Sequence, residues 1–236
     1  MMLAARPGHA LVLADGAVPS RARLDAAWPG WDAGVALVIA ADGGARNAPA
    51  LGLELDRWIG DGDSIDPADL AALAAAGVPI ERVDPEKDAS DTELALAAAV
   101  ESGADEITIL GGLGGIRTDH GVVNVLLLQQ PGLEGLAVRL YDERAARLSL
   151  LTAPLGDGGP AQAELAGHLD DLVTLVPLGG PAVGVATRGL RYPLDGESLT
   201  PGTSRGLSNV RTAPIASVSL SAGRLLVIET PATVRP

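Results

Sequence analysis

Two acidic, glycine-containing segments follow apolar runs in the first half of the sequence, DGG at 42–44 and GDGDS at 60–64. In the second segment Asp61 and Asp63 stand two residues apart, so both carboxylates can face one hard cation. Mg²⁺ prefers such oxygen ligands and usually keeps waters or substrate phosphates in its remaining positions. The alternatives are a tight turn at DGG and a solvated or helix-capping loop at GDGDS. Because Asp66 is better placed to cap the next helix, GDGDS favours a metal site.

A third segment, PEKDASDTE at 85–93, combines charge with the start of a helix. Ser90 and Glu93 form the S-x-x-E pattern of a capping box, which places Asp91 in the first helical turn. Charge at a capped helix start is common without any function. Here, however, Asp91 would face the same edge as the two earlier aspartates. A third carboxylate at that edge needs a metal or a cationic ligand to offset the repulsion.

A fourth segment, GGLGGIRTDH at 111–120, places four glycines between a strand-like run and a helix-like run. It lacks the Gly-Lys-Ser/Thr ending of a Walker A loop and does not follow the first strand, as a Rossmann glycine motif would. Arg117 could clamp a phosphate oxygen through two hydrogen bonds. Asp119 could orient that arginine or join the metal site. A lone histidine at a helix start is more often structural than catalytic, so we interpret His120 as a supporting hydrogen-bonding residue.

The elements that must position these segments alternate between strand-like and helix-like runs. The strand-like runs are His9–Ala14, Val35–Ala41, Asp56–Gly60, Val78–Val83, Glu106–Leu110 and Leu136–Tyr141. The helix-compatible segments are Pro67–Ala76, Ser90–Ser102 and Asp119–Gln130. This alternation predicts an α/β fold with a mostly parallel sheet and flanking helices. Ligands of such sheets bind beyond the carboxyl ends of the strands, where the aspartates and glycines stand.

The pattern changes at about Leu148. The later runs are short and β-like, and glycine, proline, serine and aspartate separate them. They are Leu172–Pro177, Val183–Thr187, Ile215–Leu220 and Arg224–Ile228. We therefore predict two domains, an α/β domain over 1–145 and an all-β, sandwich-like domain over 150–236, with a linker within Arg144–Gly159.

Composition narrows the function classes. The chain carries 17 basic and 30 acidic residues, a formal net charge of -13, which argues against a nucleic-acid or anionic-membrane partner. It contains no cysteine, so disulfide and thiolate chemistry are excluded. The N-terminus is a poor signal peptide and no apolar run reaches membrane-spanning length, so we expect a soluble, cytoplasmic protein.

Taken in order, the four segments resemble the catalytic domain of the thiamine pyrophosphokinase family, whose pattern runs D-G-G, G-D-x-D-S, K-D-x-T-D and G-G-R-x-D-H with an asparagine shortly after. Here the third and fourth motifs read KDASD at 87–91 and GGIRTDH at 114–120, followed by Asn124. The β-rich end also resembles the family's thiamine-binding domain. TRGLRYPL at 187–194 and GLSN at 206–209 stand where the family has G-L-x-Y-x-L and S-N motifs.

The resemblance implies transfer of pyrophosphate from ATP to the hydroxyl of thiamine, with Mg²⁺ as cofactor. It implies metal ligands among Asp61, Asp63 and Asp91, and catalytic groups among Asp63, Asp91, Arg117 and Asp119, with Asp91 or Asp63 accepting the hydroxyl proton. The implied ATP-binding residues are Asp42, Gly43, Gly44, Ser90, Gly112, Gly114, Gly115 and Arg117. The implied thiamine-binding residues are Ser208, Asn209 and Asp91. It further implies ATP and thiamine as partners and a homodimer with the active site between subunits.

Three departures from the family pattern stand out. Ser90 replaces a threonine, which keeps the hydroxyl; Ile116 is inserted before Arg117; and Val210 follows Ser-Asn where an acidic residue is common. Two rival functions remain open. One is a pyrophosphokinase for another alcohol, such as a hydroxymethylpterin, and the other is a nucleotide- or thiamine-binding sensor without catalysis.

Overall fold

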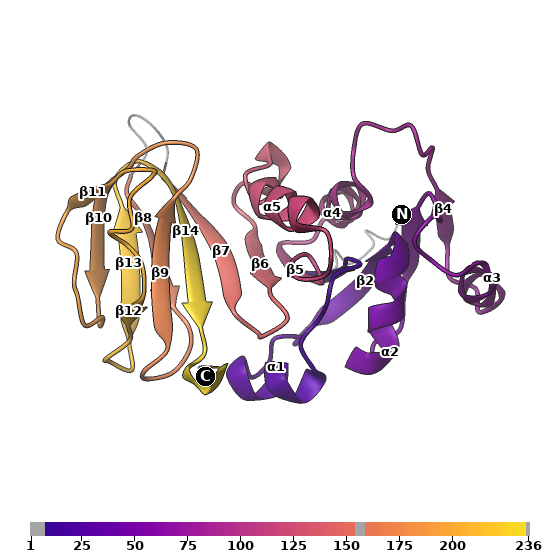
Figure 1. The fold of residues 1–236 in the computed structure, drawn as a ribbon, viewed down its shortest axis with the longest axis horizontal. Helices are drawn as coiled ribbons and strands as arrows, with labels where there is room; N and C mark the ends of the chain where they lie inside the picture. Colours follow the sequence, from indigo (N-terminus) through magenta and orange to yellow (C-terminus); the bar gives the residue numbers. More distant parts are fainter. Residues whose placement is uncertain (1–7, 154–158, 235–236) are drawn as a thin grey trace, which may run out of the picture. The chain divides into compact units, whose positions relative to one another are not determined.

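The computed structural model describes residues 8–153 and 159–234, and the chain divides into two compact units, Met1–Arg144 and Ala145–Pro236 (Figure 1). We call them unit 1 and unit 2 and describe each by itself.

Unit 1 contains a six-stranded sheet in the order β6-β5-β1-β2-β3-β4, and every neighbouring pair is parallel. Its strands are β1 (His9–Leu13), β2 (Val35–Ala41), β3 (Arg57–Gly60), β4 (Ile80–Arg82), β5 (Glu106–Leu110) and β6 (Ala137–Tyr141). The parallel sheet predicted from the alternating runs is therefore confirmed. β1 and the end of β2 are buried, which is why they appear as continuous apolar runs rather than alternating ones.

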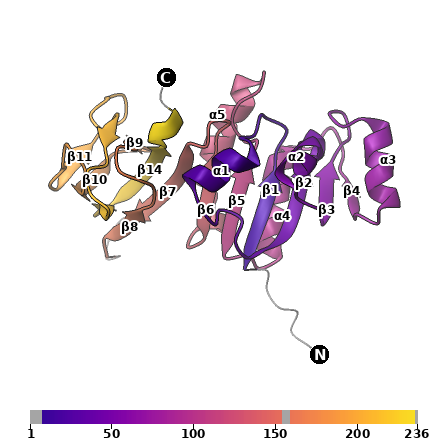
Figure 2. The same cartoon turned by 90° about the horizontal axis from the view of Figure 1, so that it is seen from below.

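Helices lie on both faces of this sheet, with α4 and α5 on one face and α1 and α2 on the other (Figures 1 and 2). The α-helices are α1 (Arg21–Ala27), α2 (Ala48–Leu51), α3 (Pro67–Ala75), α4 (Asp91–Glu101) and α5 (Thr118–Leu127). The 3₁₀ helices are η1 (Asp42–Asn47) and η2 (Pro131–Leu133). The predicted caps are present, since the side chain of Asp66 accepts from Ala68 N and that of Ser90 from Glu93 N.

The strand order reverses between β1 and β5. The chain builds the sheet outward from β1 through β2, β3 and β4, then returns to place β5 and β6 on the other side of β1. α4 makes this return and packs across β1, β2 and β3, so its N-terminus lies over the ends of the strands that carry the acidic loops. In open α/β sheets a ligand crevice forms at such a reversal, beyond the carboxyl ends of the strands.

Unit 2 is a sandwich of two antiparallel sheets, in the orders β7-β14-β9-β12 and β11-β10-β13-β8. Its strands are β7 (Arg147–Ala153), β8 (Ala161–Leu165), β9 (Leu172–Pro177), β10 (Ala182–Arg188), β11 (Glu197–Leu199), β12 (Asn209–Val210), β13 (Ala216–Leu220) and β14 (Gly223–Thr230), followed by η3 (Ala232–Val234). One core joins them, with Val173 and Leu225 from the first sheet packed among Val185 and Val218 from the second. The predicted all-β, sandwich-like half is confirmed.

The boundary between the two units lies inside the segment predicted to contain the linker, but that segment also holds a strand that was not predicted. Seven residues of the segment predicted as a linker form β7, which pairs with β14 along its whole length, from Arg147 opposite Glu229 to Ala153 opposite Gly223. The unit boundary falls between Arg144 and Ala145, at the start of the predicted segment. β7 was not predicted because it alternates only weakly between apolar and polar residues, and the glycines and prolines that follow it indicate a loop.

Candidate active site

A cavity of about 520 Å³ opens in unit 1 at the carboxyl edge of the sheet. Its walls come from the segments that follow β1, β2, β3 and β5 and from the N-terminal turns of α4 and α5. They include residues of all four motifs, among them Asp42, Asp61, Asp91 and Arg117. The strand reversal between β1 and β5 therefore brings together segments that lie as far apart in the sequence as Ala14 and Asn124.

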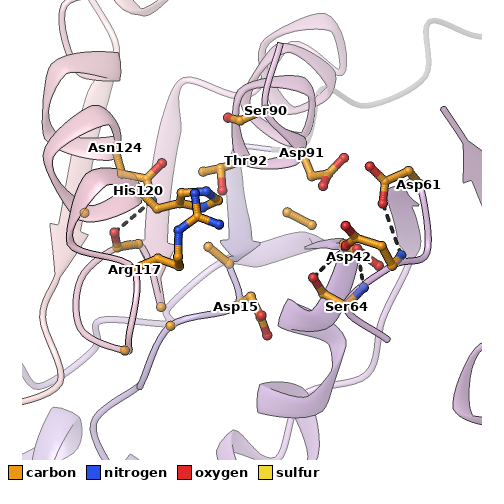
Figure 3. A pocket seen from close by; sticks show the side chains of 18 of the residues that line it. Asp15, Asp42, Asp61, Ser64, Ser90, Asp91, Thr92, Arg117, His120 and Asn124 are labelled. Atoms are coloured by element: carbon orange, nitrogen blue, oxygen red, sulfur yellow. Dashed lines mark hydrogen bonds between the residues drawn. The ribbon is translucent and has the colours of Figure 1, made fainter. Parts of the chain in front are cut away.

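Three carboxylates converge on one side of this cavity. One oxygen each from Asp42, Asp61 and Asp91 lies within 4.8 Å of the others, and Figure 3 shows the three side chains facing one another. Arg117 and His120 lie on the opposite side in the same view. The arrangement offers negative charge at one end of the cavity and a guanidinium at the other, as a metal–phosphate ligand requires.

Asp42 reaches this position through an unusual backbone. It is the first residue of η1, directly after β2, and has φ of 42°, in the left-handed region that non-glycine residues rarely adopt. Ser64 N donates to its Oδ2 at 3.1 Å, and its backbone oxygen accepts from Trp58 Nε1 at 3.0 Å. A side chain at Gly60 would meet Asp42 Cβ at 2.8 Å, so glycine is required beside it. Backbone strain of this kind concentrates at functional sites, where the surrounding structure must hold it.

Burial disfavours the ionised forms of Asp42 and Asp91. Burial, together with the neighbouring carboxyls of Asp63, Asp91 and Asp61, raises the pKa of Asp42 to about 6. Burial also raises the pKa of Asp91, although the Lys87 ammonium works against the increase. The hydrogen bond from Lys87 lowers the pKa of Asp61. Carboxylates held this close favour a bound cation, because each destabilises the charge of the next.

Lys87 is a functional candidate to which our sequence reading gave no role, although it is part of the third motif. Its Nζ lies 2.9 Å from Asp61 Oδ2 and 3.1 Å from Asp91 Oδ1, and only 16 % of its side chain is exposed. The i, i+4 spacing from Asp91 was the available signal, since a lysine one turn before a helical aspartate can reach it.

Asp63 does not belong to the group of three that the structure brings together. Its side chain is exposed, and its Oδ1 accepts from Ser64 Oγ at 2.7 Å. Asp63 N in turn donates to Asp61 Oδ1 at 3.1 Å, so this turn aims Asp61 into the cavity and leaves Asp63 on its wall. The structure therefore brings Asp61 and Asp91 together with Asp42, while Asp63 lines the same cavity beside them, and its expected role as a metal ligand stays a prediction. Adjacent carboxylates in a loop need not face one point.

Gly43 and Gly44, expected to bind the nucleotide, are tightly packed against neighbouring residues. Neither lines the cavity. A side chain at Gly44 would collide with the backbone of Leu13 at the end of β1, and one at Gly43 would collide with Asp15 and Arg46. These glycines let η1 lie against the neighbouring strand, which places Asp42 at the cavity.

The glycine-rich loop after β5 does line the cavity, as expected. Gly114 and Gly115 have φ of 80° and 91°, conformations that side chains disfavour. Gly112 packs against Leu140, and its backbone oxygen accepts from Asn124 Nδ2 at 2.8 Å. Asn124 therefore anchors the loop from the buried side of α5.

Arg117 and Asp119 form a two-pronged ion pair at the cavity mouth. Arg117 Nε donates to Asp119 Oδ1 at 2.9 Å and its Nη2 donates to Asp119 Oδ2 at 2.6 Å. The pair lowers the pKa of Asp119 and raises that of Arg117. The insertion before Arg117 leaves Ile116 almost fully exposed and keeps Arg117 in the wall of the cavity. Of the two roles expected for Asp119, orienting Arg117 and joining the metal site, this contact favours the first.

Asp15 is a second cavity residue to which our sequence reading gave no role. It follows β1 and pairs with Arg46, and burial raises its pKa despite that pairing. The signal was present, since Asp15-Gly16 ends an apolar run in the same way as Asp42-Gly43-Gly44. Ser90 and His120 also line the cavity, and Ser90 caps α4 as predicted.

Ser208 and Asn209 lie in unit 2. Asn209 is buried, and its side chain bonds both backbone groups of Tyr192, accepting from the nitrogen at 3.0 Å and donating to the oxygen at 2.6 Å. It also lines a small cavity of about 100 Å³ together with Tyr192 and Leu207. Ser208 is exposed with φ of 56°. The five aromatic residues are all described, and Tyr192 is the exposed one among them.

The carboxylate trio fits a hard divalent cation. Its donors are oxygens from three separate segments, and Asp42 Oδ1 is buried without a hydrogen bond from any described residue. A buried oxygen without a protein donor needs another partner, and a bound divalent cation would be one.

Two family models match the chain, one for each unit. Residues 31–140 match the model "Thiamin pyrophosphokinase, catalytic domain". Residues 164–225 match the model "Thiamin pyrophosphokinase, vitamin B1 binding domain". All four motif segments lie within the first match, and the GLSN segment lies within the second.

Known proteins agree with these matches. A Bacillus subtilis protein named thiamine pyrophosphokinase is 27 % identical over 169 residues, which is 72 % of this chain and 75 % of that protein. A solved Bacillus subtilis structure of that name superposes with a TM-score of 0.79 at 23 % identity, covering 94 % of this chain and 99 % of that one. The Candida albicans thiamin pyrophosphokinase gives 0.75 at 13 % identity, covering 94 % and 89 %. At these identities the structures support the fold.

Proposed function

The chain belongs to the thiamine pyrophosphokinase family, and we propose on that basis that it transfers pyrophosphate from ATP to the hydroxyl group of thiamine, releasing AMP. The observation that carries the proposal is the convergence of Asp42, Asp61 and Asp91 in a cavity whose opposite wall is a glycine-rich loop with Arg117. Both ends of such a cavity can bind a triphosphate. At the acidic end its phosphate oxygens contact a bound cation, and at the other end they accept hydrogen bonds directly from the protein.

In the proposed reaction the thiamine oxygen forms a bond to the β-phosphorus, and the bond from that phosphorus to the α-phosphate oxygen breaks. The hydroxyl proton passes to a carboxylate, for which Asp91 and Asp63 remain the candidates. Arg117, oriented by Asp119, stabilises the charge that builds on the transferred phosphate oxygens. The backbone of the loop from Gly112 to Gly115 positions the nucleotide, so most of the catalysis is orientation and electrostatics.

Mg²⁺ is the proposed cofactor, held by Asp61 and Asp91 together with Asp42, and with Asp63 within reach on the cavity wall. When bound, the ion neutralises phosphate charge and lowers the barrier to attack on phosphorus. Ser90 caps the start of α4 and thereby positions Asp91 as a ligand.

Thiamine is proposed to bind through unit 2, with Ser208 and Asn209 on the pocket segment and Asp91 from unit 1. Tyr192 is the candidate for stacking on the thiamine rings, because the other four aromatic side chains are buried. We also propose a homodimer in which the active site lies between subunits, and a cytoplasmic location. No helix in the described ranges is both long and apolar enough to cross a bilayer.

An AMP-release assay with ATP, Mg²⁺ and thiamine tests the proposal. We expect AMP and thiamine pyrophosphate to form in equal amounts, and no AMP when thiamine is omitted. A parallel reaction with a hydroxymethylpterin tests the alternative acceptor, and equal or faster turnover with it would replace thiamine in the proposal. ATP binding with no AMP from either acceptor would instead indicate a sensor.

A further inference from the structure

Lys87 bridges two of the three carboxylates at the acidic end of the cavity. Its ammonium lies 2.9 Å from Asp61 Oδ2 and 3.1 Å from Asp91 Oδ1, and the carboxylates come from different segments, the loop after β3 and the first turn of α4. All three side chains are partly buried, with exposed fractions of 16 % for the lysine, 11 % for Asp61 and 22 % for Asp91. An ion pair this enclosed is screened much less than a surface pair.

Other cations near the cavity contact different groups. Arg46 pairs with Asp15, and Arg117 pairs with Asp119. Arg82 is exposed and reaches the backbone oxygen of Asp61 at 3.3 Å rather than its carboxylate. Among the described residues, Lys87 is thus the cation recorded in contact with the carboxylates of the trio.

A fixed positive charge in this position opposes a second cation on the same oxygens. A divalent ion bound by Asp61 and Asp91 would lie close to the Lys87 ammonium, at a distance where like charges repel strongly in a partly buried site. A triphosphate changes this balance, because its phosphate oxygens add negative charge to the site and offer the ammonium other acceptors.

We propose that Lys87 is a positioning residue that keeps the affinity of the free protein for divalent ions low, so that the metal binds productively only together with the triphosphate. This inference rests on the proposed function, since it concerns the order in which that site is filled. Lys87 acts through Asp61 and Asp91, holding both side chains in place before the nucleotide binds.

Binding of Mn²⁺ to the full-length protein without nucleotide tests the proposal, with free Mn²⁺ measured by electron paramagnetic resonance. Lys87→Met removes the charge but keeps an unbranched apolar stem. We expect it to bind Mn²⁺ about tenfold more tightly than the unsubstituted protein, or more. Lys87→Arg keeps the charge and should bind Mn²⁺ as weakly as the unsubstituted protein. Arg82→Met removes a nearby exposed charge and should change the affinity by less than about twofold.

Equal or weaker Mn²⁺ binding by Lys87→Met would overturn the proposal, and so would an equal gain in Arg82→Met. If Lys87→Met does not fold, Lys87→Gln is measured in its place with the same expectation. Repeating the titration with a non-hydrolysable ATP analogue should abolish or reverse the advantage of the neutral variant. The AMP assay is independent of these results, because a protein that makes no AMP can still show the Lys87 effect, and an active enzyme can lack it.

Discussion

Unit 1 gathers three partly or fully buried carboxylates, two of which share one lysine, whereas Glu229 and Asp171 in unit 2 each have donors of their own, although Glu229 Oε1 accepts no hydrogen bond from the described residues. Glu229, on β14, accepts two hydrogen bonds from Arg147 on the neighbouring strand. Asp171 accepts from His168 N at 2.6 Å and from Ala232 N at 2.7 Å. Burial raises the pKa of Glu229, and the paired arginine partly offsets the increase.

The difference separates a structural use of buried charge from a functional one. In unit 2 the ionic groups hold neighbouring strands and loops together. Arg211 does the same by donating to four backbone oxygens, those of Leu165, Ala166, Ala213 and Pro214. In unit 1 the acidic groups exceed their protein partners, and the excess faces a cavity. A surplus of charge that the fold does not compensate identifies the site where a ligand must do so.

The largest expected effect is on the stability of unit 2. Arg147→Met leaves Glu229 buried without its cation, and we expect the free energy of unfolding to fall by about 3–5 kcal/mol. Urea unfolding of the full-length protein measures the change. Arg188→Met, at an exposed position of β10, is the matched control and should cost less than about 0.5 kcal/mol. Equal losses in the two variants would show that the buried pair is not a distinct stabilising group.

The next effect is on activity in unit 1. Asp91→Asn removes one carboxylate of the trio and should lower AMP formation by about 10²–10³-fold, the range found when one transition-state-stabilising group is lost. Its melting temperature should not fall, because the substitution relieves repulsion. Asp69→Asn makes the same change in the first turn of α3, away from the cavity lining, and should leave activity intact. Full activity in Asp91→Asn would contradict the site assignment.

A smaller effect concerns the pH dependence of stability that the buried carboxyl of Asp42 in unit 1 causes. The pKa of Asp42 is raised from 3.8 to about 6, so the folded protein binds this proton more tightly than the unfolded chain. Stability should therefore fall as pH rises from about 4 to about 6 and then stay constant, by on the order of 1–3 kcal/mol for this group. Asp42→Asn removes the penalty and should be more stable than the unsubstituted protein at pH 7.5.

Thermal unfolding of both proteins from pH 4 to pH 8, in buffer with a metal chelator, measures this difference. The gap between them should narrow towards pH 4, where Asp42 is protonated in the folded state. A gap that is constant across the range would mean that the carboxyl of Asp42 titrates normally and that its burial is compensated.

Local sequence patterns were enough to predict the strands and helices that carry the site. Val35–Ala41 and Glu106–Leu110 form strands with the predicted bounds, and Asp66 and Ser90 cap helices as their positions indicated. Such features depend on neighbouring residues, because strand runs, caps and helix starts are set by short-range sterics and hydrogen bonds. β7 was missed because pairing with β14, rather than its own pattern, makes it a strand.

The sequence by itself thus determined that acidic and glycine-rich segments would stand at one edge of a parallel sheet, because every such segment follows a strand. Only the tertiary structure decided which side chains meet there. Strand order places Asp42 beside Asp61, its left-handed backbone turns it into the cavity, and the return through α4 adds Asp91 and Lys87. Those choices depend on contacts between residues far apart in the chain, which no local pattern encodes.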